Sequence, residues 1–307
     1  MSVVDNILES LPLNRSEVEL LLWTAPSRYK VHEIEKRNGR GKRTIAQPTA
    51  EIKILQRLML DRHIARLPIS DVATAYRKGI GIANHALAHA PNKYLLKLDF
   101  KDFFPSIRGV DFLKHVHKYS DISPEDAKWL TRLFFWRPKG GRNLILSIGA
   151  PSSPAISNTV MFDFDNIVKN YCTSKGVIYT RYADDLALST NQPDVLNDVY
   201  KFVVNTCLSL RYPRIELNKD KTVFTSKKHR RQLTGLVLSN DGVASIGRDR
   251  KRLLRSMADH FNKGSLPNEK IGTLRGWMAF AMSIDPSFVA SVRRMLGDEK
   301  FQQLMKT

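Results

Sequence analysis

The sequence of 307 residues predicts an α+β fold whose C-terminal part is entirely helical. Short apolar or alternating stretches bounded by turn residues indicate strands, and segments of helical periodicity separate them. The expected strands lie near residues 93–98, 177–190 and 215–246. From Arg248 onward only helical periodicity remains, in three expected segments with breaks near 264–267 and 285–286. Strands followed by a run of helices are typical of an α+β chain.

The N-terminal part is expected to form helices around a basic hairpin. Apolar residues at helical spacing predict two short helices within residues 3–25, the second capped by Ser16. Residues 28–46 alternate in character around an Asn-Gly turn at 38–39, which predicts a β-hairpin. A helix should follow over residues 51–65, because apolar side chains recur there on one face.

The middle of the chain is expected to place helices between two strand units. The apolar strand 93–98 should end at Asp99, and two helices should fill residues 108–136. Residues 177–190 predict a strand–turn–strand unit with adjacent aspartates near its tip, followed by a further helix.

A loop of glycine, serine and proline precedes another expected helix. Residues 149–154 predict a tight loop in which Ser153 caps a helix that begins at Pro154 and runs to about Asn170. Gly149 lets the backbone approach a ligand, and a helix N-terminus favours phosphate. Taken alone, the same pattern is also common in ordinary loops.

The composition favours a polyanionic partner. Lys and Arg number 49 against 30 Asp and Glu, a formal net charge of +19, which favours nucleic acid first and an anionic membrane second. Residues 211–255 hold 13 Lys and Arg against 4 Asp and Glu, although a solvated face is an alternative explanation. No apolar run approaches the roughly 20 residues that span a bilayer, and the N-terminus does not read as a signal peptide. With Cys172 and Cys207 alone, a disulfide framework is excluded, and a cytoplasmic protein without a membrane partner is expected.

Three carboxylates indicate a metal site in this basic chain. Asp184 and Asp185 lie in the Tyr-Ala-Asp-Asp turn of the second strand unit, and Asp99 follows a buried strand. An acidic side chain there is costly unless it is paired or bound to a cation. If both strand units share one sheet, the trio converges and can hold two Mg²⁺ ions, which serve phosphoryl or nucleotidyl transfer.

The order of these motifs resembles that of the reverse transcriptases. The stretches that resemble the palm motifs are 99–104, 149–154, 182–185 and 218–222. Those that resemble the fingers and the primer-grip and thumb region are 43–48, 76–79, 232–236 and 275–277. The bacterial retron reverse transcriptases are the most similar group, because they are compact and lack a separate RNase H domain.

Two further stretches resemble elements of the retron enzymes. Residues 84–89 resemble an insertion that ends in Ala-x-x-His, and residues 233–235 resemble a Val-Thr-Gly element. Three positions depart from the pattern: Ile148 stands in place of Gln, His85 in place of Asn, and Leu233 in place of Val.

The resemblance implies a right-hand polymerase fold with fingers, a palm built on an antiparallel sheet, and a helical thumb. The implied divisions are fingers in 1–92, a palm strand in 93–105, fingers and palm helices in 106–150, palm and primer grip in 151–245, and thumb in 246–307.

The resemblance also implies roles for individual residues. Asp99 and Asp184 are expected to be the principal metal ligands, with Asp185 in support and the Phe100 carbonyl as a further ligand. Lys221 is the candidate general acid for the pyrophosphate leaving group, with Lys219 as the alternative. The expected nucleotide-binding residues are Arg43 at the triphosphate, assisted by Lys42 or Arg77, the backbone of Asp102 and Phe103, the Gly149 loop, and Phe104 as the steric gate against a ribose 2′-OH. The expected RNA- and primer-binding residues are Thr234, Gly235, Arg248, Arg250, Lys251, Arg252 and Arg255.

The implied partners are dNTPs, a dedicated structured noncoding RNA and the RNA–DNA product copied from it. Priming from a guanosine 2′-OH would give branched multicopy single-stranded DNA, and such systems resemble antiphage defence modules with a toxin or effector protein. The alternatives are another bacterial reverse transcriptase, of the group II intron-like or diversity-generating kind, and a non-catalytic RNA-binding scaffold.

Overall fold

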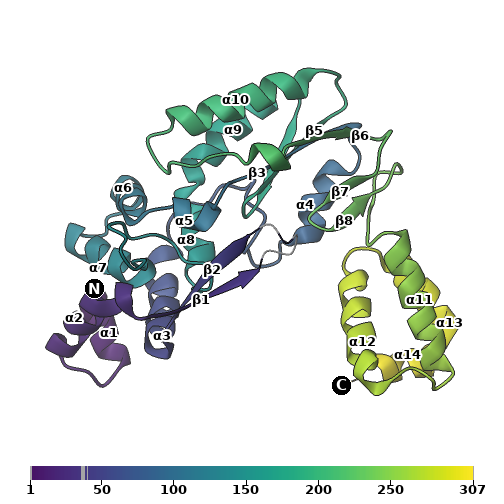
Figure 1. Cartoon of the computed structure of the whole chain (residues 1–307), viewed down its shortest axis with the longest axis horizontal. Helices are drawn as coiled ribbons and strands as arrows, with labels where there is room; N and C mark the ends of the chain where they lie inside the picture. Colours follow the sequence, from purple (N-terminus) through teal and green to yellow (C-terminus); the bar gives the residue numbers. More distant parts are fainter. Residues whose placement is uncertain (1, 36–38, 40, 307) are drawn as a thin grey trace.

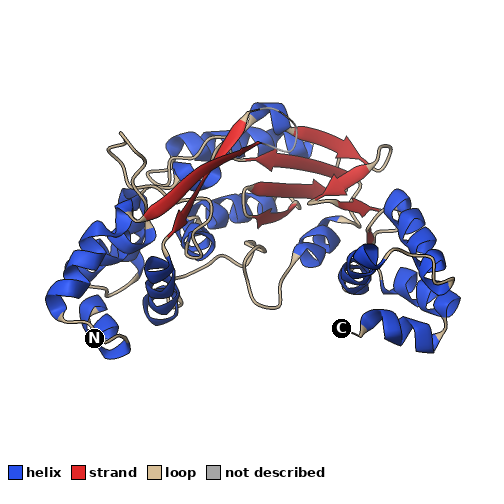
Figure 2. Ribbon diagram, turned by 60° about the horizontal axis from the view of Figure 1, so that its bottom comes forward, coloured by secondary structure: helices blue, strands red, loops and turns tan. Residues whose placement is uncertain are grey.

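The computed structural model describes residues 2–35, 39 and 41–306 as an arch (Figures 1 and 2). Figure 2 shows the N-terminal helices at one end of the arch, the C-terminal helices at the other, and strands running between them. Among the described helices, none combines the length and the apolar character that a membrane crossing requires.

The N-terminal end consists of helices around one long hairpin. The helices of this end are α1 (Val3–Ser10), α2 (Arg15–Thr24), α3 (Ala50–Met59), α6 (Gly109–Tyr119) and α7 (Pro124–Phe134). The hairpin pairs β1 (Tyr29–Glu35) with β2 (Lys42–Pro48), antiparallel. A π-helical turn continues α3 to Ile64, so the expected helices, hairpin and helix end are confirmed.

Two local details of this end differ from expectation or cannot be compared with it. Ser16 was the wrong cap: Asn14 caps α2, because its side chain accepts the Glu17 backbone N–H while the Glu17 carboxylate accepts the Asn14 N–H. Asn38, expected in the hairpin turn, lies outside the described residues.

The centre of the arch is a four-stranded antiparallel sheet of order β4-β5-β3-β6. Its strands are β3 (Tyr94–Asp99), β4 (Ile178–Tyr182), β5 (Asp185–Thr190) and β6 (Val223–Ser226). The helices around it are α4 (Ile82–His89), α5 (Phe103–Ser106), α8 (Ser153–Val160), α9 (Phe162–Ser174) and α10 (Val195–Ser209). The helix expected over 154–170 is therefore two helices that part at Met161, and the first begins one residue early, with Ser152 rather than Ser153 at its N-cap.

Period-two alternation gives the two faces of this sheet different neighbours. Leu96, Leu98 and Leu188 belong to the large core cluster that also contains residues of α9 and α10. Leu95 and Ala187 belong instead to a second cluster with α4 and the C-terminal helices. Since Asp99 pairs with Asp185, and Leu95 with Ser189, the two aspartates lie on the face of this second cluster.

The C-terminal end is a small sheet followed by helices, coloured green to yellow in Figure 1. The strands are β7 (Arg231–Leu233), β8 (Leu236–Leu238) and β9 (Ala244–Ser245). The helices are α11 (Arg248–Asn262), α12 (Asn268–Met282), α13 (Pro286–Leu296) and α14 (Asp298–Met305). The described part of this region thus holds four helices rather than three, because Gly297 takes a φ of +78° and separates α13 from α14.

Candidate active site

Strand pairing brings the three predicted carboxylates together. Asp99, at the end of β3, is the cross-strand partner of Asp185, at the start of β5. Asp184 lies in the intervening β4–β5 turn, where its backbone carbonyl accepts the Phe100 N–H at 3.0 Å. The Asp99 carbonyl in turn accepts the Asn218 N–H at 2.7 Å. These two bonds fix the backbone at Asp184 and at Asp99.

The cluster contains more negative charge than its surroundings neutralise. Burial, and then the charges of Asp184 and Asp99, raise the pKa of Asp185 to about 6. Burial and the charge of Asp99 also raise the pKa of Asp184, while Lys221 and Arg43 act in the opposite direction. The Lys221 ammonium contacts both carboxylate oxygens of Asp99, at 2.8 and 2.9 Å. Lys221 therefore supplies the counter-charge for one carboxylate of the three.

The donor set suits a divalent cation, although it is not arranged around one. Carboxylate oxygens are the ligands that hard divalent ions prefer, and the raised pKa values show that a cation would relieve the mutual repulsion. Over residues 2–35, 39 and 41–306, no three His, Cys, Asp or Glu side chains form a group that could hold a metal ion as they stand. Both carboxylate oxygens of Asp99, one of the expected ligands, instead accept from the Lys221 ammonium.

The predicted nucleotide-binding residues follow Asp99 directly. Asp102 takes a φ of +45° and precedes α5, a left-handed conformation that is uncommon outside glycine. Phe103 is buried and stacks on Phe100 with ring centroids 5.5 Å apart, whereas Phe104 is half-buried beside it. Arg43 is exposed on β2, and its charge reaches Asp184.

The close approach predicted at Gly149 is an approach to the chain itself. A Cβ at this position, where φ is +120°, would lie 3.2 Å from the Ala46 carbonyl oxygen and 3.0 Å from the Gln47 Cγ. The Ala46 N–H also donates to the Ile148 carbonyl at 2.9 Å. The loop before α8 is thus packed against the β2 strand that carries Arg43.

The two predicted assistants of Arg43 have other partners. Lys42 pairs with Glu33 across the hairpin at 3.2 Å. Arg77 donates through Nη1 to three backbone carbonyls, those of Ser70, Asp71 and Ala73, at 3.1–3.4 Å. Arg77 therefore stabilises the preceding loop, residues 70–73, by hydrogen bonds to its backbone.

The predicted RNA-binding residues divide into exposed and engaged groups. Thr234 and Gly235 form the two-residue turn between β7 and β8, both with positive φ. On α11, Arg248, Arg252 and Arg255 are exposed, although the Arg255 guanidinium lies 5.3 Å from the centre of the Phe288 ring. Arg250 instead lies 4.0 Å above the Trp277 ring, and Lys251 forms a 2.6 Å ion pair with Asp285.

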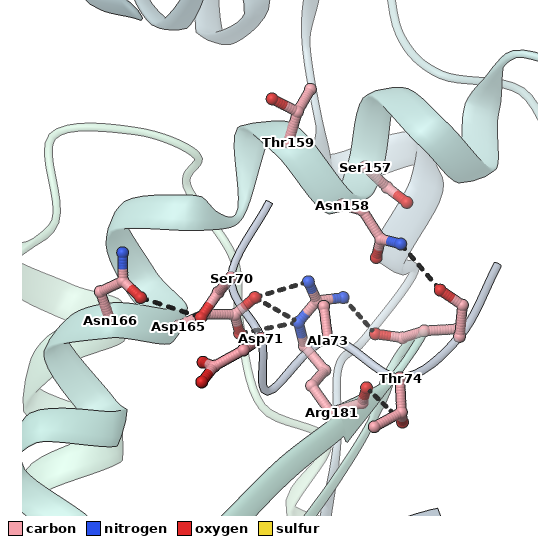
Figure 3. Close-up of polar contacts among 12 residues, drawn as sticks. Ser70, Asp71, Ala73, Thr74, Ser157, Asn158, Thr159, Asp165, Asn166 and Arg181 are labelled. Carbon is pink, nitrogen blue, oxygen red and sulfur yellow. Dashed lines mark hydrogen bonds and ion pairs between the residues drawn. The ribbon is translucent and has the colours of Figure 1, made fainter. Parts of the chain in front are cut away.

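A buried ion pair next to the Tyr-Ala-Asp-Asp turn was not among the sequence predictions. The guanidinium of Arg181 and the carboxylate of Asp165 are both fully buried and bonded to each other, as Figure 3 shows. The sequence contained a signal for this pair. Arg181 lies two residues after the core residue Tyr179 on the same expected strand, so its charged side chain should point into the core.

A second unpredicted residue is Tyr76. Its φ of +60° is unusual, and half of its surface is exposed. Burial and then the charge of Asp184 raise its pKa, which places Tyr76 within electrostatic reach of the carboxylates.

The insertion-like helix α4 is fastened to the sheet by two buried histidines. His89 bonds Ser189 Oγ at 2.7 Å and Thr180 Oγ1 at 2.8 Å, and His85 Nδ1 bonds Thr180 Oγ1 at 2.7 Å. Burial lowers the pKa of His85 to about 4 and, with the neighbouring His85, that of His89 to about 3. Both rings are therefore neutral at ordinary pH.

Comparison with known proteins identifies similar chains. A family model described as reverse transcriptase (RNA-dependent DNA polymerase) matches residues 34–238. Retron Ec83 reverse transcriptase of Escherichia coli is 38% identical over 294 residues, which cover 94% of each chain. Retron Ec86 reverse transcriptase of the same organism is 31% identical over 291 residues, 93% of this chain and 86% of that one. A solved telomerase of Candida albicans, in complex with a fragment of telomeric RNA, aligns with a TM-score of 0.49 and 13% identity, over 94% of this chain and 59% of its own.

Proposed function

This chain belongs to the reverse transcriptase family and, within it, to the retron reverse transcriptases, and we propose that it copies part of a cognate structured noncoding RNA into DNA. It is an RNA-directed DNA polymerase with the right-hand fold, and catalysis in this family depends on divalent metal ions. The proposed divisions are fingers in 1–92, a palm strand in 93–105, fingers and palm helices in 106–150, palm and primer grip in 151–245, and thumb in 246–307.

The observation that carries the proposed site is the register of β3 against β5. It sets Asp99 opposite Asp185, directly beside the Asp184 turn, on the sheet face opposite the core helices α9 and α10. We assign Asp99 and Asp184 as the principal ligands of two Mg²⁺ ions, with Asp185 and the Phe100 carbonyl in support. When bound, the two ions would activate the attacking hydroxyl and stabilise the leaving oxygen.

The remaining roles belong to the chain's own side chains. Arg43 would hold the triphosphate, with the backbone of Asp102 and Phe103 alongside it. Phe104 would exclude nucleotides that carry a ribose 2′-OH, and the Gly149 loop, packed against β2, would bind the nucleotide beside Arg43. Lys221 would donate its Nζ proton to the pyrophosphate after leaving Asp99. Both lysines are exposed, and the contact of Lys221 with Asp99 is what favours Lys221 over Lys219.

The finer biological role is also a proposal. Priming from a guanosine 2′-OH of the cognate RNA would yield branched multicopy single-stranded DNA. That product, with the enzyme, would restrain a toxin or effector protein in antiphage defence. Support comes from the likeness to the Ec83 and Ec86 retron reverse transcriptases over nearly the whole chain.

The first prediction tests the carboxylate site. Asp184→Asn keeps the size of the side chain and removes the charge that a metal requires, so incorporation of dNTPs on a primed RNA template in Mg²⁺ buffer should be abolished. The measurement is primer extension beside Asp194→Asn, a matched change of an exposed aspartate before α10, which should retain parental activity. Full activity of Asp184→Asn would refute the assignment.

The same pair of variants separates a polymerase from an RNA-binding scaffold. Nucleic acid that copurifies with each protein is sequenced, and its RNA–DNA junction is tested for a 2′,5′ linkage. The parent and Asp194→Asn should carry RNA and branched DNA, whereas Asp184→Asn should carry the RNA alone. A parent protein that carries RNA without DNA and extends no primer would favour the scaffold.

A further inference from the structure

We propose that Arg181 and Asp165, a buried ion pair on the opposite sheet face from the catalytic carboxylates, position the Ala183–Asp184 turn for DNA synthesis. The inference rests on the function proposed for that turn and adds two residues that do not themselves reach the carboxylate cluster. Both side chains are 0% exposed. Arg181 lies two residues after Tyr179 on β4, so both side chains point to the same face of the sheet, the face packed against α9.

The guanidinium joins α9 to the catalytic turn. Its Nε and Nη2 donate to the two carboxylate oxygens of Asp165 at 2.8 and 2.7 Å, and its Nη1 donates to the Ala183 carbonyl at 3.0 Å. Asp165 also accepts the Tyr179 hydroxyl at 2.9 Å. The planar, five-donor fork of arginine suits this arrangement, since one group must satisfy a carboxylate and a carbonyl at fixed angles.

The turn that Arg181 holds is in an unfavourable conformation. Ala183 takes a φ of +57°, in the left-handed region where a Cβ crowds the backbone. Its carbonyl is held by Arg181 from one side, and the next carbonyl, that of Asp184, is held by the Phe100 N–H. The conformation that presents Asp184 therefore depends on contacts from outside the turn.

The backbone of Arg181 also holds the loop that leads to Tyr76. Its N–H donates to the Val72 carbonyl, and its carbonyl accepts the Thr74 N–H, both at 2.8 Å. The Thr74 hydroxyl bonds the same carbonyl, and Asn158 Nδ2 donates to the next residue of the loop, Ala75 (Figure 3). One residue thus connects the Asp184 turn, α9 and the loop before Tyr76.

A purely stabilising role does not explain the pair. Removing two charges from water is costly, and well-packed apolar replacements of buried ion pairs are often neutral or stabilising. What an apolar replacement cannot supply is a donor to the Ala183 carbonyl. The distinguishing property of this pair is the hydrogen bond that it directs at the turn.

The test replaces the pair without leaving a buried charge. The variant is Asp165→Leu with Arg181→Met, and both it and its control carry Tyr179→Phe, because that hydroxyl would otherwise lose its acceptor. We expect a protein with near-parental thermal unfolding and RNA affinity. Its kcat for dNTP incorporation should fall on the order of 100-fold, as for a misplacement near 1 Å. Binding of Mn²⁺ without nucleotide, followed by electron paramagnetic resonance, should weaken in parallel.

A rescue distinguishes positioning from packing. Ala183→Gly, added to the triple variant, should restore part of the lost rate and Mn²⁺ affinity, because glycine adopts positive φ without the steric cost. A folded triple variant with parental rate and Mn²⁺ affinity would overturn the inference. Loss of folding in the triple variant would also overturn it, because the pair would then be a structural requirement. The inference would equally fail if Ala183→Gly restored neither the rate nor the Mn²⁺ affinity.

A different result would refute the proposed function itself. If the parent protein incorporates no dNTPs, the chain is not the polymerase that we propose. Even then, the Mn²⁺ affinities of the parent, of the triple variant and of the triple variant with Ala183→Gly still report whether the pair positions the turn.

Discussion

At the scale of single residues, the site combines groups whose neighbours determine what they can do. Lys221 pairs with Asp99, whereas no ion pair with Asp185 occurs among the described residues and burial raises the pKa of Asp185 to about 6. Phe103 is buried against Phe100, whereas Phe104 beside it is only half-buried. Phe103 and Phe104 are adjacent residues of one type, and we expect different roles for them because their burial differs.

Phe104 gives a prediction about sugar selectivity. Phe104→Val opens the space that a 2′-OH would occupy, so the ratio of rNTP to dNTP incorporation should rise by roughly 10- to 100-fold, a range typical of small changes in an apolar pocket. Single-nucleotide extension with each substrate measures the ratio. Phe224→Val, at an exposed ring on β6 of the same sheet, is the control and should leave it unchanged. An unchanged ratio in Phe104→Val would remove Phe104 from this role.

At the scale of elements, α4 is held on the sheet by polar bonds. His85 and His89 lie one helical turn apart and reach Thr180 of β4 and Ser189 of β5. Their rings lie 5.7 Å apart. Among the described residues, no carboxylate bonds either ring. A proton on one of them would therefore be buried without a counter-charge.

This arrangement predicts acid sensitivity. The pKa of each histidine is lower in the folded chain, about 4 and about 3, than the usual 6.5, so the unfolded chain binds more protons as the pH falls. The pair's contribution to stability is complete above pH 6.5 and declines from there toward pH 4 and 3. The free energy of unfolding, measured with urea at pH 7 and pH 5, should fall by about 1 kcal/mol or more.

Matched variants isolate the contribution of the pair. His89→Gln should reduce the difference between pH 7 and pH 5, because one protonation site of the unfolded chain is gone. His32→Gln, at an exposed histidine on β1, should leave the difference as it is in the parent. His115, whose pKa burial also lowers to about 4, contributes to all three proteins. Equal pH differences in His89→Gln and the parent would contradict the assignment.

At the scale of the whole molecule, a small acidic centre lies within a strongly basic chain. The chain has a formal net charge of +19, and its Asp99 and Asp185 carboxylates lie on paired strands beside the Asp184 turn. Figure 1 shows the hairpin of β1 and β2, which carries Arg43, apart from the basic helix α11 of the C-terminal end. A template and its growing duplex would be held largely by backbone phosphates.

Salt dependence tests this electrostatic interpretation. Affinity for the cognate RNA should fall steeply with salt, and Arg248→Ala or Arg252→Ala should each reduce the slope of log affinity against log salt by about 0.7 to 0.9. Arg250→Ala should instead lower thermal stability, because that side chain is stacked on Trp277. Lys201→Ala, an exposed lysine on α10, is the control for charge alone. Affinity that hardly changes with salt would show that phosphate contacts are not dominant.

Much of the fold was predictable because its signals are local. Alternation and helical spacing located both strand units and most helices, and the Tyr-Ala-Asp-Asp turn identified the site. The errors were also local: caps assigned to Ser16 and Ser153 rather than Asn14 and Ser152, and helix breaks missed at Met161 and Gly297. They concern single residues at helix ends, where a cap contributes about 0.5–2 kcal/mol and the boundary shifts by one or two residues.

The sequence by itself determined the order of the chemical groups, and with it the family and the class of reaction. Tertiary structure alone decided which charges have partners: Lys221 on Asp99, 122 residues away, and Arg181 on Asp165 and Ala183. It also decided that Gly149 is pressed against β2. The physical reason is that sequence periodicity encodes the direction of a side chain relative to its own element, whereas the neutralisation of a charge depends on distances between elements.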